Sequence, residues 1–145
     1  MVSSRYARMF TCRYKPQFEG CNGSRANNWL AGAKISGASP AYNIDEMAYA
    51  LKTADAKFLF TAPGSMKVAT GAAREAGVST SDLFLLEGDL EGYSTVHDLI
   101  KIGKGYGEAG QVPAYKIPAG KKNKDICGFL SFSSGTTGLP KAVRP

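Results

Sequence analysis

Helical and strand-like stretches alternate along the middle of the chain. After Asn43, apolar residues recur at the three- and four-residue spacing of one helix face, at Met47, Ala50, Leu51 and Ala54. Asn43 can cap this helix, and Glu46, three residues later, can complete a capping box. The same spacing predicts a second helix over residues 65–76, which Gly77 ends. A third, shorter helix is predicted over residues 95–102.

Three short apolar runs lie between and after these helices. They span residues 57–61, 83–86 and 126–132, and their length and turn-forming neighbours predict buried strands. The order helix, strand, helix, strand, helix, strand is typical of an α/β protein. We therefore expect an α/β fold with a mostly parallel sheet flanked by helices, joined by right-handed crossovers.

Two parts of the chain lack such a pattern. Residues 1–28 have no clear period, because Gly, Asn, Ser and charged residues interrupt every apolar stretch. We expect this segment to be disordered or a misfit with the rest of the chain. Residues 103–124 contain two prolines, many glycines and a lysine run, as a linker does. The predicted organisation is an atypical segment 1–28 and a partial domain 29–145.

Composition and charge exclude several classes of function. With 43% hydrophobic and 21% charged residues, the chain of 145 residues is typical of one globular domain or part of a larger one. The net charge of +6 comes mainly from residues 1–35 and from the lysine run 121–124. Neither forms an identifiable recognition element, so binding to nucleic acid is the weakest hypothesis. No apolar run approaches the roughly 18 residues of a membrane span.

The residues that most often carry catalysis or bind metals are sparse. The three cysteines form no C-x-x-C pair, and with a single histidine they predict no metal site. Cys127 lies in an apolar run and is most simply a small buried hydrophobic residue. His97 has Asp98 beside it, but no G-x-S-x-G elbow exists to complete a triad, so we expect a surface helix histidine. No catalytic residue is predicted.

A G-x-G-x-x-G pattern occurs at Gly105, Gly107 and Gly110. A dinucleotide-binding fingerprint needs a strand before the glycines and a helix after them. Here a predicted helix precedes them and Pro113 comes closely after, which favours a flexible linker.

The stretch after the last predicted strand is the most informative. It reads Ser133, Ser134, Gly135, Thr136, Thr137, Gly138, Leu139, Pro140, Lys141. Glycines let a backbone approach a ligand closely, and consecutive N–H groups in such a turn form an anion-binding nest. Hydroxyls add donors, and a lysine adds a positive charge. The lysine spacing is not that of a Walker A loop. The residues alone leave two interpretations open, a phosphate loop and a flexible turn.

Residues 132–143 resemble the signature phosphate loop of the AMP-dependent synthetase and ligase family, whose members form adenylates. Residues 36–51 resemble the Gly-Ala-Asn-Pro-x-Tyr stretch and following helix of its 4-coumarate:CoA ligase-like, acyl-CoA synthetase branch. Ser39 stands where that branch usually has Asn. The resemblance extends over residues 29–143 and implies part of the N-terminal domain of an adenylate-forming enzyme.

The resemblance implies a two-step ligase reaction. Such enzymes bind ATP, Mg²⁺ and a carboxylic acid, form an acyl-adenylate with release of pyrophosphate, and transfer the acyl group to CoA. By resemblance, the β- and γ-phosphates would be bound by Ser133, Ser134, Gly135, Thr136, Thr137, Gly138 and Lys141. The family's later adenine, ribose, Mg²⁺ and catalytic-lysine segments do not occur in this sequence.

We therefore expect a ligase fragment that is inactive alone, with Mg²⁺ ligated mainly by parts that this chain lacks. The alternative is a non-catalytic truncated remnant or a weak nucleotide-phosphate-binding module. The expected compartment for the parent family is the cytoplasm or the peroxisome.

Overall fold

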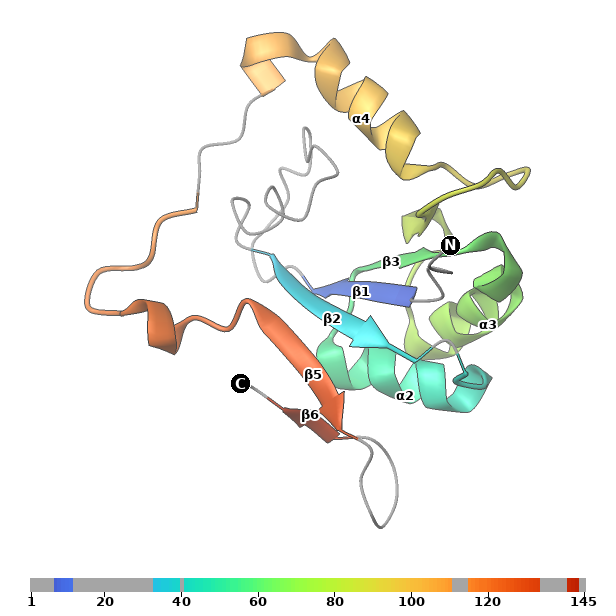
Figure 1. Ribbon diagram of the computed structural model, residues 1–145, viewed down its shortest axis with the longest axis horizontal. Coiled ribbons are helices and arrows are strands. Elements are labelled where there is room, and N and C mark those ends of the chain that lie inside the picture. The colour runs from blue at the N-terminus through green and yellow to red at the C-terminus, as the bar shows by residue number, and fades with distance from the viewer. Residues whose placement is uncertain (1–6, 12–32, 40, 111–114, 134–140, 144–145) are drawn as a thin grey trace, which may run out of the picture.

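The computed structural model describes residues 7–11, 33–39, 41–110, 115–133 and 141–143. Within these residues a six-stranded sheet forms, with its strands in the order β4-β3-β1-β2-β5-β6 (Figure 1). The strands are β1 (Ala7–Thr11), β2 (Lys34–Ala38), β3 (Phe58–Thr61), β4 (Leu83–Leu85), β5 (Phe129–Ser133) and β6 (Lys141–Val143). The three predicted strands correspond to β3, β4 and β5.

Strand direction confirms the α/β class and corrects one detail. β3 pairs with β4 in parallel, and β2 pairs with β5 in parallel. β1 is antiparallel to both β2 and β3, so β2, β3, β4 and β5 all run in the same direction. The sheet is mixed rather than mostly parallel, because two strands that were not expected, β1 in the N-terminal segment and β6 after the predicted loop, are antiparallel to their neighbours. In the register, Met9 of β1 stands between Ser36 and Leu59.

Two helices follow the predicted pattern closely. α2 (Ile44–Ala54) begins with the expected capping box, in which the Glu46 N–H donates to Asn43 Oδ1 at 2.9 Å. In return, the Asn43 N–H donates to Glu46 Oε2 at 3.0 Å. After the short turn η1 (Pro63–Ser65), α3 (Met66–Ala76) ends at Gly77, whose φ of 74° is left-handed. The N-terminus of α2 and the C-terminus of α3 therefore follow from local sequence chemistry.

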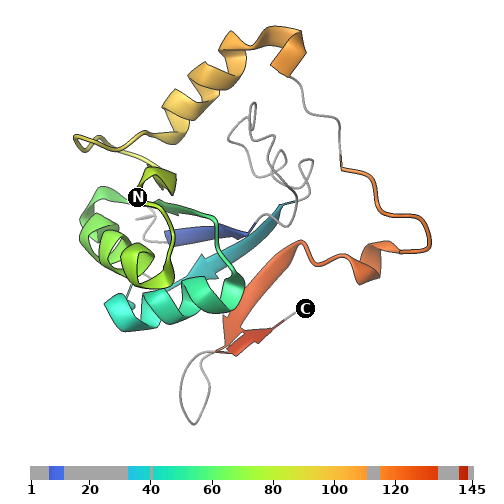
Figure 2. The same cartoon turned by 180° about the vertical axis from the view of Figure 1, so that it is seen from behind.

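The core lies between these two helices and one face of the sheet (Figures 1 and 2). Its largest fully buried side chains are those of Leu51, Leu59, Leu83 and Leu85. The helices contribute mostly alanines, including the fully buried Ala50, Ala72 and Ala73. Because side-chain size sets the distance between packed helices, these short side chains let α2 and α3 lie close together.

The opposite face of the sheet carries aromatic side chains. Along a strand, successive side chains point to opposite faces, so Phe58 and Phe60 alternate with the buried Leu59. The ring centroid of Phe84 on β4 lies 5.1 Å from that of Phe60 and 6.4 Å from that of Phe58. These tilted stacks join β3 to β4 on the face away from α2 and α3.

The third helix, α4 (Val96–Gly105), extends away from the sheet (Figure 2). None of its residues is fully buried, and His97 is exposed, as expected. The glycine pattern falls on the end of α4 and on the 3-10 turn η3 (Gly107–Gly110), so the helix before it is confirmed. Among the described residues, no helix has the length and apolar character needed to cross a membrane.

The other short turns are η2 (Thr80–Asp82), which leads into β4, and η4 (Asn123–Asp125), which precedes β5. All residues from 115 to 125 are exposed. Of the predicted linker 103–124, residues 103–105 belong to α4 and residues 107–110 to η3.

Candidate functional site

Strands β5 and β6 bracket the predicted phosphate loop. They pair antiparallel, and the register places Ser133 directly opposite Lys141. The structure therefore brings together the first and last of the predicted site residues, which are eight positions apart in sequence. The remaining predicted residues, Ser134, Gly135, Thr136, Thr137 and Gly138, lie outside the described residues.

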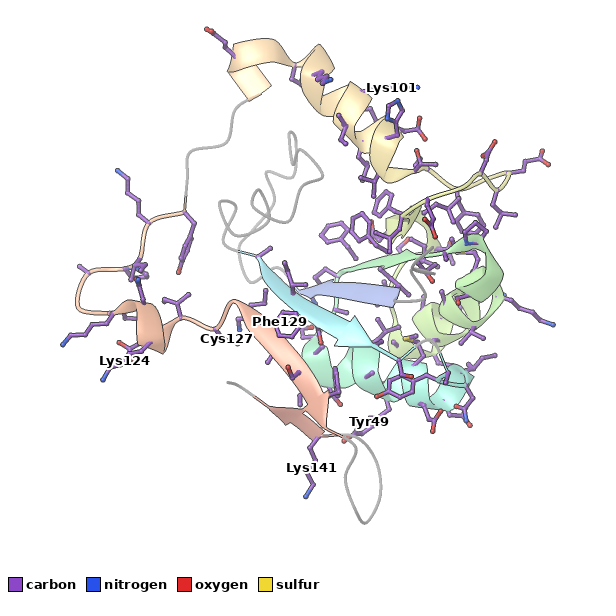
Figure 3. All side chains as sticks on the ribbon, viewed as in Figure 1. Tyr49, Lys101, Lys124, Cys127, Phe129 and Lys141 are labelled. Atoms are coloured by element: carbon purple, nitrogen blue, oxygen red, sulfur yellow. The ribbon has the colours of Figure 1, made fainter. Side chains whose placement is uncertain are left out.

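Lys141 is the first residue of β6 and is exposed. Figure 3 shows its side chain pointing away from the sheet at the end of β6 nearest the loop. Among the residues that the structure describes, no carboxylate forms an ion pair with its ammonium group. The positive charge of Lys141 is therefore not neutralised by this part of the chain and can attract an anion.

The site lies at one particular edge of the sheet. Because β5 runs parallel to β2, their carboxyl ends meet at the same edge, which is where open α/β sheets bind ligands. The N-terminus of α2 follows β2 at this edge, but the capping box already occupies its Asn43 and Glu46 N–H groups. Asp45 and Glu46 also place negative charge there. The charge that favours an anion comes from Lys141 rather than from α2.

One side chain joins β5 to the rest of the sheet. Ser36 of β2 is fully buried, and its hydroxyl donates a hydrogen bond to the Leu130 carbonyl oxygen at 3.0 Å. The Ile35 N–H donates to the Gly128 carbonyl oxygen, also at 3.0 Å. Ser36 was not identified from the sequence. The available signal was a hydroxyl residue flanked by apolar neighbours within a short strand-like run.

The other chemically active side chains lie apart from this edge or serve the fold. Cys127 is only partly buried, contrary to expectation, because it precedes β5 in a stretch that no described helix covers. Its thiol donates a hydrogen bond to the Phe129 carbonyl oxygen at 3.3 Å.

Tyr42 packs at the border of the core. Burial raises the pKa of the Tyr42 hydroxyl, and the Glu46 carboxylate raises it further.

The described side chains suit a phosphate better than a metal ion. Lys141 supplies a cation at the mouth of a loop whose sequence is rich in hydroxyls and glycines. Within the described part of the chain, no three His, Cys, Asp or Glu side chains gather closely enough to bind a metal ion. Among the described residues, the exposed positive charge of Lys141 is therefore the feature that suits an anionic group such as a phosphate.

Solved structures with a similar fold share this arrangement of helices and strands. The luciferase-like enzyme of the nonluminescent mealworm Zophobas morio superposes with a TM-score of 0.58 and 22% identity over 83% of this chain. For the anthranilate CoA ligase AuaEII, solved with anthranoyl-AMP, the TM-score is 0.54 and the sequence identity is 21% over 75% of this chain. For MbtA from Mycobacterium smegmatis, the TM-score is 0.52 and the sequence identity is 19% over 72% of this chain. At these identities the likeness establishes the fold.

The chain is short relative to these structures, since it spans 26%, 19% and 18% of their respective lengths. No curated protein matches it in sequence. A family model described as "AMP-binding enzyme" matches residues 28–144, which is most of the chain and includes β2 through β6. The chain therefore belongs to the AMP-binding enzyme family.

Proposed function

We propose that this chain is the ATP-phosphate-binding part of an acid–CoA ligase of the 4-coumarate:CoA ligase-like, acyl-CoA synthetase branch. The observation that carries the proposal is the pairing of Ser133 with Lys141 at the carboxyl edge of the sheet. It supports the proposal because Lys141, which has no ion-pair partner among the described residues, borders the stretch whose sequence resembles the family's phosphate loop. One structural neighbour is itself a CoA ligase with a bound acyl-adenylate.

The residues of the loop would act by position and charge. Bound ATP supplies the adenylyl group that activates a carboxylic acid. The ammonium group of Lys141 pairs with a phosphate oxygen, and hydroxyl and backbone N–H groups of residues 133–138 donate to the other oxygens. Both contributions stabilise the negative charge that grows on the departing pyrophosphate. No proton transfer is required from any of these groups.

We propose further that the chain alone does not complete the reaction. Among the described residues, no three His, Cys, Asp or Glu side chains gather closely enough to bind a metal ion. The carboxylic acid and CoA would therefore meet their binding groups in a longer protein, in the cytoplasm or the peroxisome. The second candidate is a non-catalytic module that binds nucleotide phosphates weakly through the exposed Lys141.

Binding of inorganic pyrophosphate and ATP to the full chain tests the phosphate site. We expect Lys141→Ala to lower the affinity about tenfold, the factor for a lost charge-assisted hydrogen bond of roughly 1.5 kcal/mol. Lys124→Ala is the matched control, because Lys124 is also exposed but lies on η4 (Figure 3). Equal affinities for the wild type and both variants would contradict the phosphate site.

Exchange of labelled pyrophosphate into ATP separates the two candidate functions. With a panel of aromatic and aliphatic carboxylic acids, we expect the chain alone to give no exchange above the Lys141→Ala background. Exchange above that background would show that the chain forms adenylates by itself and would overturn the proposal that it is inactive alone.

A further inference from the structure

We propose that Ser36 is a positioning residue that fixes β5 against β2 and thereby places Lys141 at the phosphate site. This inference rests on the proposed function, and it concerns how the fold holds the site rather than what binds there. Ser36 belongs to β2, far in sequence from the loop. Its hydroxyl is bonded to the Leu130 carbonyl oxygen in β5.

Within the described residues, β5 has few other attachments to the sheet. Its pairing with β2 extends over two register positions, Ile35 with Phe129 and Ser36 with Leu130. Its other neighbour is β6, which has three residues. Phe129 and Ser131 are exposed, whereas Leu130 and Phe132, on the other face of β5, pack partly buried against the core. These apolar contacts fix which face of β5 is covered, and the hydrogen bond from Ser36 adds a directional contact at one position along the strand.

The geometry of this bond selects one register. A shift of one residue would turn every side chain of β5 to the other face and move the Leu130 carbonyl oxygen away from Ser36. Leu130 lies three residues before Ser133, which pairs with Lys141. The bond at Ser36 therefore fixes the position of Ser133 at the end of β5. The pairing of β5 with β6 in turn fixes the position of Lys141.

The fold contains a second buried hydroxyl that serves as an internal control. Thr61 of β3 is also fully buried and lies on the same face as Leu59. Among the described residues, its Oγ1 atom has no hydrogen-bond partner. Replacing Thr61 by Val thus removes a buried hydroxyl without removing a bond between strands, whereas Ser36→Ala removes both.

Amide hydrogen exchange on the full-length chain tests the attachment directly. The Ile35 N–H, bonded to Gly128, reports on the β2–β5 pair, and the Leu86 N–H, bonded to Thr61, reports on the β3–β4 end. We expect Ser36→Ala to accelerate exchange at Ile35 about fivefold relative to Leu86, the factor for one net hydrogen bond.

Two further variants define the outcomes. Ser36→Cys keeps the shape with a weaker S–H donor, so its exchange ratio should fall between those of the wild type and Ser36→Ala. Thr61→Val should leave the ratio at the wild-type value. Equal acceleration at Ile35 and Leu86 in Ser36→Ala, or the same ratio change in Thr61→Val, would overturn the proposal.

Inorganic pyrophosphate binding supplies the functional arm. We expect Ser36→Ala to weaken binding about threefold to fivefold, Ser36→Cys less, and Thr61→Val not at all. If the wild-type chain binds and Ser36→Ala binds equally well, Ser36 does not position the site. If the wild-type chain does not bind, the proposed function fails, while the exchange ratio still decides whether Ser36 fixes β5.

Discussion

The helix-covered part of the molecule (residues 33–86) and the β5–β6 pair differ sharply in burial. Among the side chains that the structure describes, every buried one lies between Ala33 and Leu85. In β5 and β6 no described side chain is buried, and Phe129 is 42% exposed. Yet the candidate phosphate site belongs to the β5–β6 pair.

The difference separates the source of stability from the source of function. Buried apolar area, supplied by α2, α3 and the strands beneath them, is the main favourable contribution to folding. The site needs exposure, because Lys141 must meet a ligand from solvent. Functional groups are commonly carried on segments that a rigid scaffold positions. Here β5 contacts the scaffold through its pairing with β2, through the buried hydroxyl of Ser36 and through the partly buried Leu130 and Phe132.

The largest expected effect comes from opening a cavity in the helix-covered part. Leu59→Ala should lower the free energy of unfolding by about 2–5 kcal/mol, because the Leu59 side chain on β3 is fully buried in the core. Phe129→Ala, on exposed β5, should change it by less than about 1 kcal/mol. Urea denaturation followed by circular dichroism measures both. Equal losses for the two variants would show that β5 shares the core and would remove the contrast.

A smaller effect is expected at the helix caps. Asn43→Ala removes the capping box of α2 and should cost about 1 kcal/mol of global stability, whereas Asn43→Asp keeps an acceptor and should cost much less. Thr95→Ala removes the matching box of α4, a helix with no buried residue. It should reduce the helicity of α4 without moving the urea midpoint. A global loss for Thr95→Ala would mean that α4 belongs to the cooperative unit.

Local sequence chemistry was sufficient to predict α2, α3, β3 and β4 of the helix-covered part, but it did not predict β2. The Asn43–Glu46 box, the stop at Gly77 and the apolar runs of β3 and β4 all depend on residues close in sequence. The α/β class followed from their order. The strand β1 could not be predicted, because its place between β3 and β2 depends on partners far along the chain.

The candidate site was likewise predicted only where its residues are close in sequence. The loop sequence pointed to Ser133 and Lys141, and the register of β5 and β6 brings these two residues together. Ser36 was not predicted, because its proposed positioning role depends on a hydrogen bond to Leu130, which is 94 positions away in sequence. Cys127 was expected to be buried on the strength of its apolar neighbours, but no described helix covers that stretch. The roles of residues 134–138 stay predictions.

A similar effect is expected at a glycine that ends a helix. Gly77→Ala should cost about 1 kcal/mol, because an L side chain at φ 74° is strained even though nothing lies within 4 Å of the added Cβ. Gly105→Ala, at the end of α4, adds a side chain into open space without a positive φ. It should leave global stability unchanged or raise it slightly. Thermal denaturation of both variants isolates the effect of backbone strain, because neither added Cβ has a neighbour within 4 Å.

The smallest effects concern two aspartates, whose pKa values shift in opposite directions. Desolvation by burial raises the pKa of Asp82, in the turn before β4. Hydrogen bonds from the Thr95 hydroxyl, at 2.7 Å, and the Thr95 N–H, at 3.0 Å, lower the pKa of Asp98. An NMR titration of the two carboxyl groups should therefore find Asp98 protonating at lower pH than Asp82.

The signs for stability follow from these directions. A carboxyl group with a lowered pKa stabilises the fold above its unfolded pKa, and that contribution disappears as the pH falls through its folded pKa, which for Asp98 lies below the ordinary value of an aspartate. A raised pKa acts oppositely, so protonation of Asp82 on acidification favours the fold. Thr95→Val should return the pKa of Asp98 toward its ordinary value and leave Asp82 unchanged. If both carboxyl groups shift together in this variant, α4 is coupled to the helix-covered part, and the two regions are not independent.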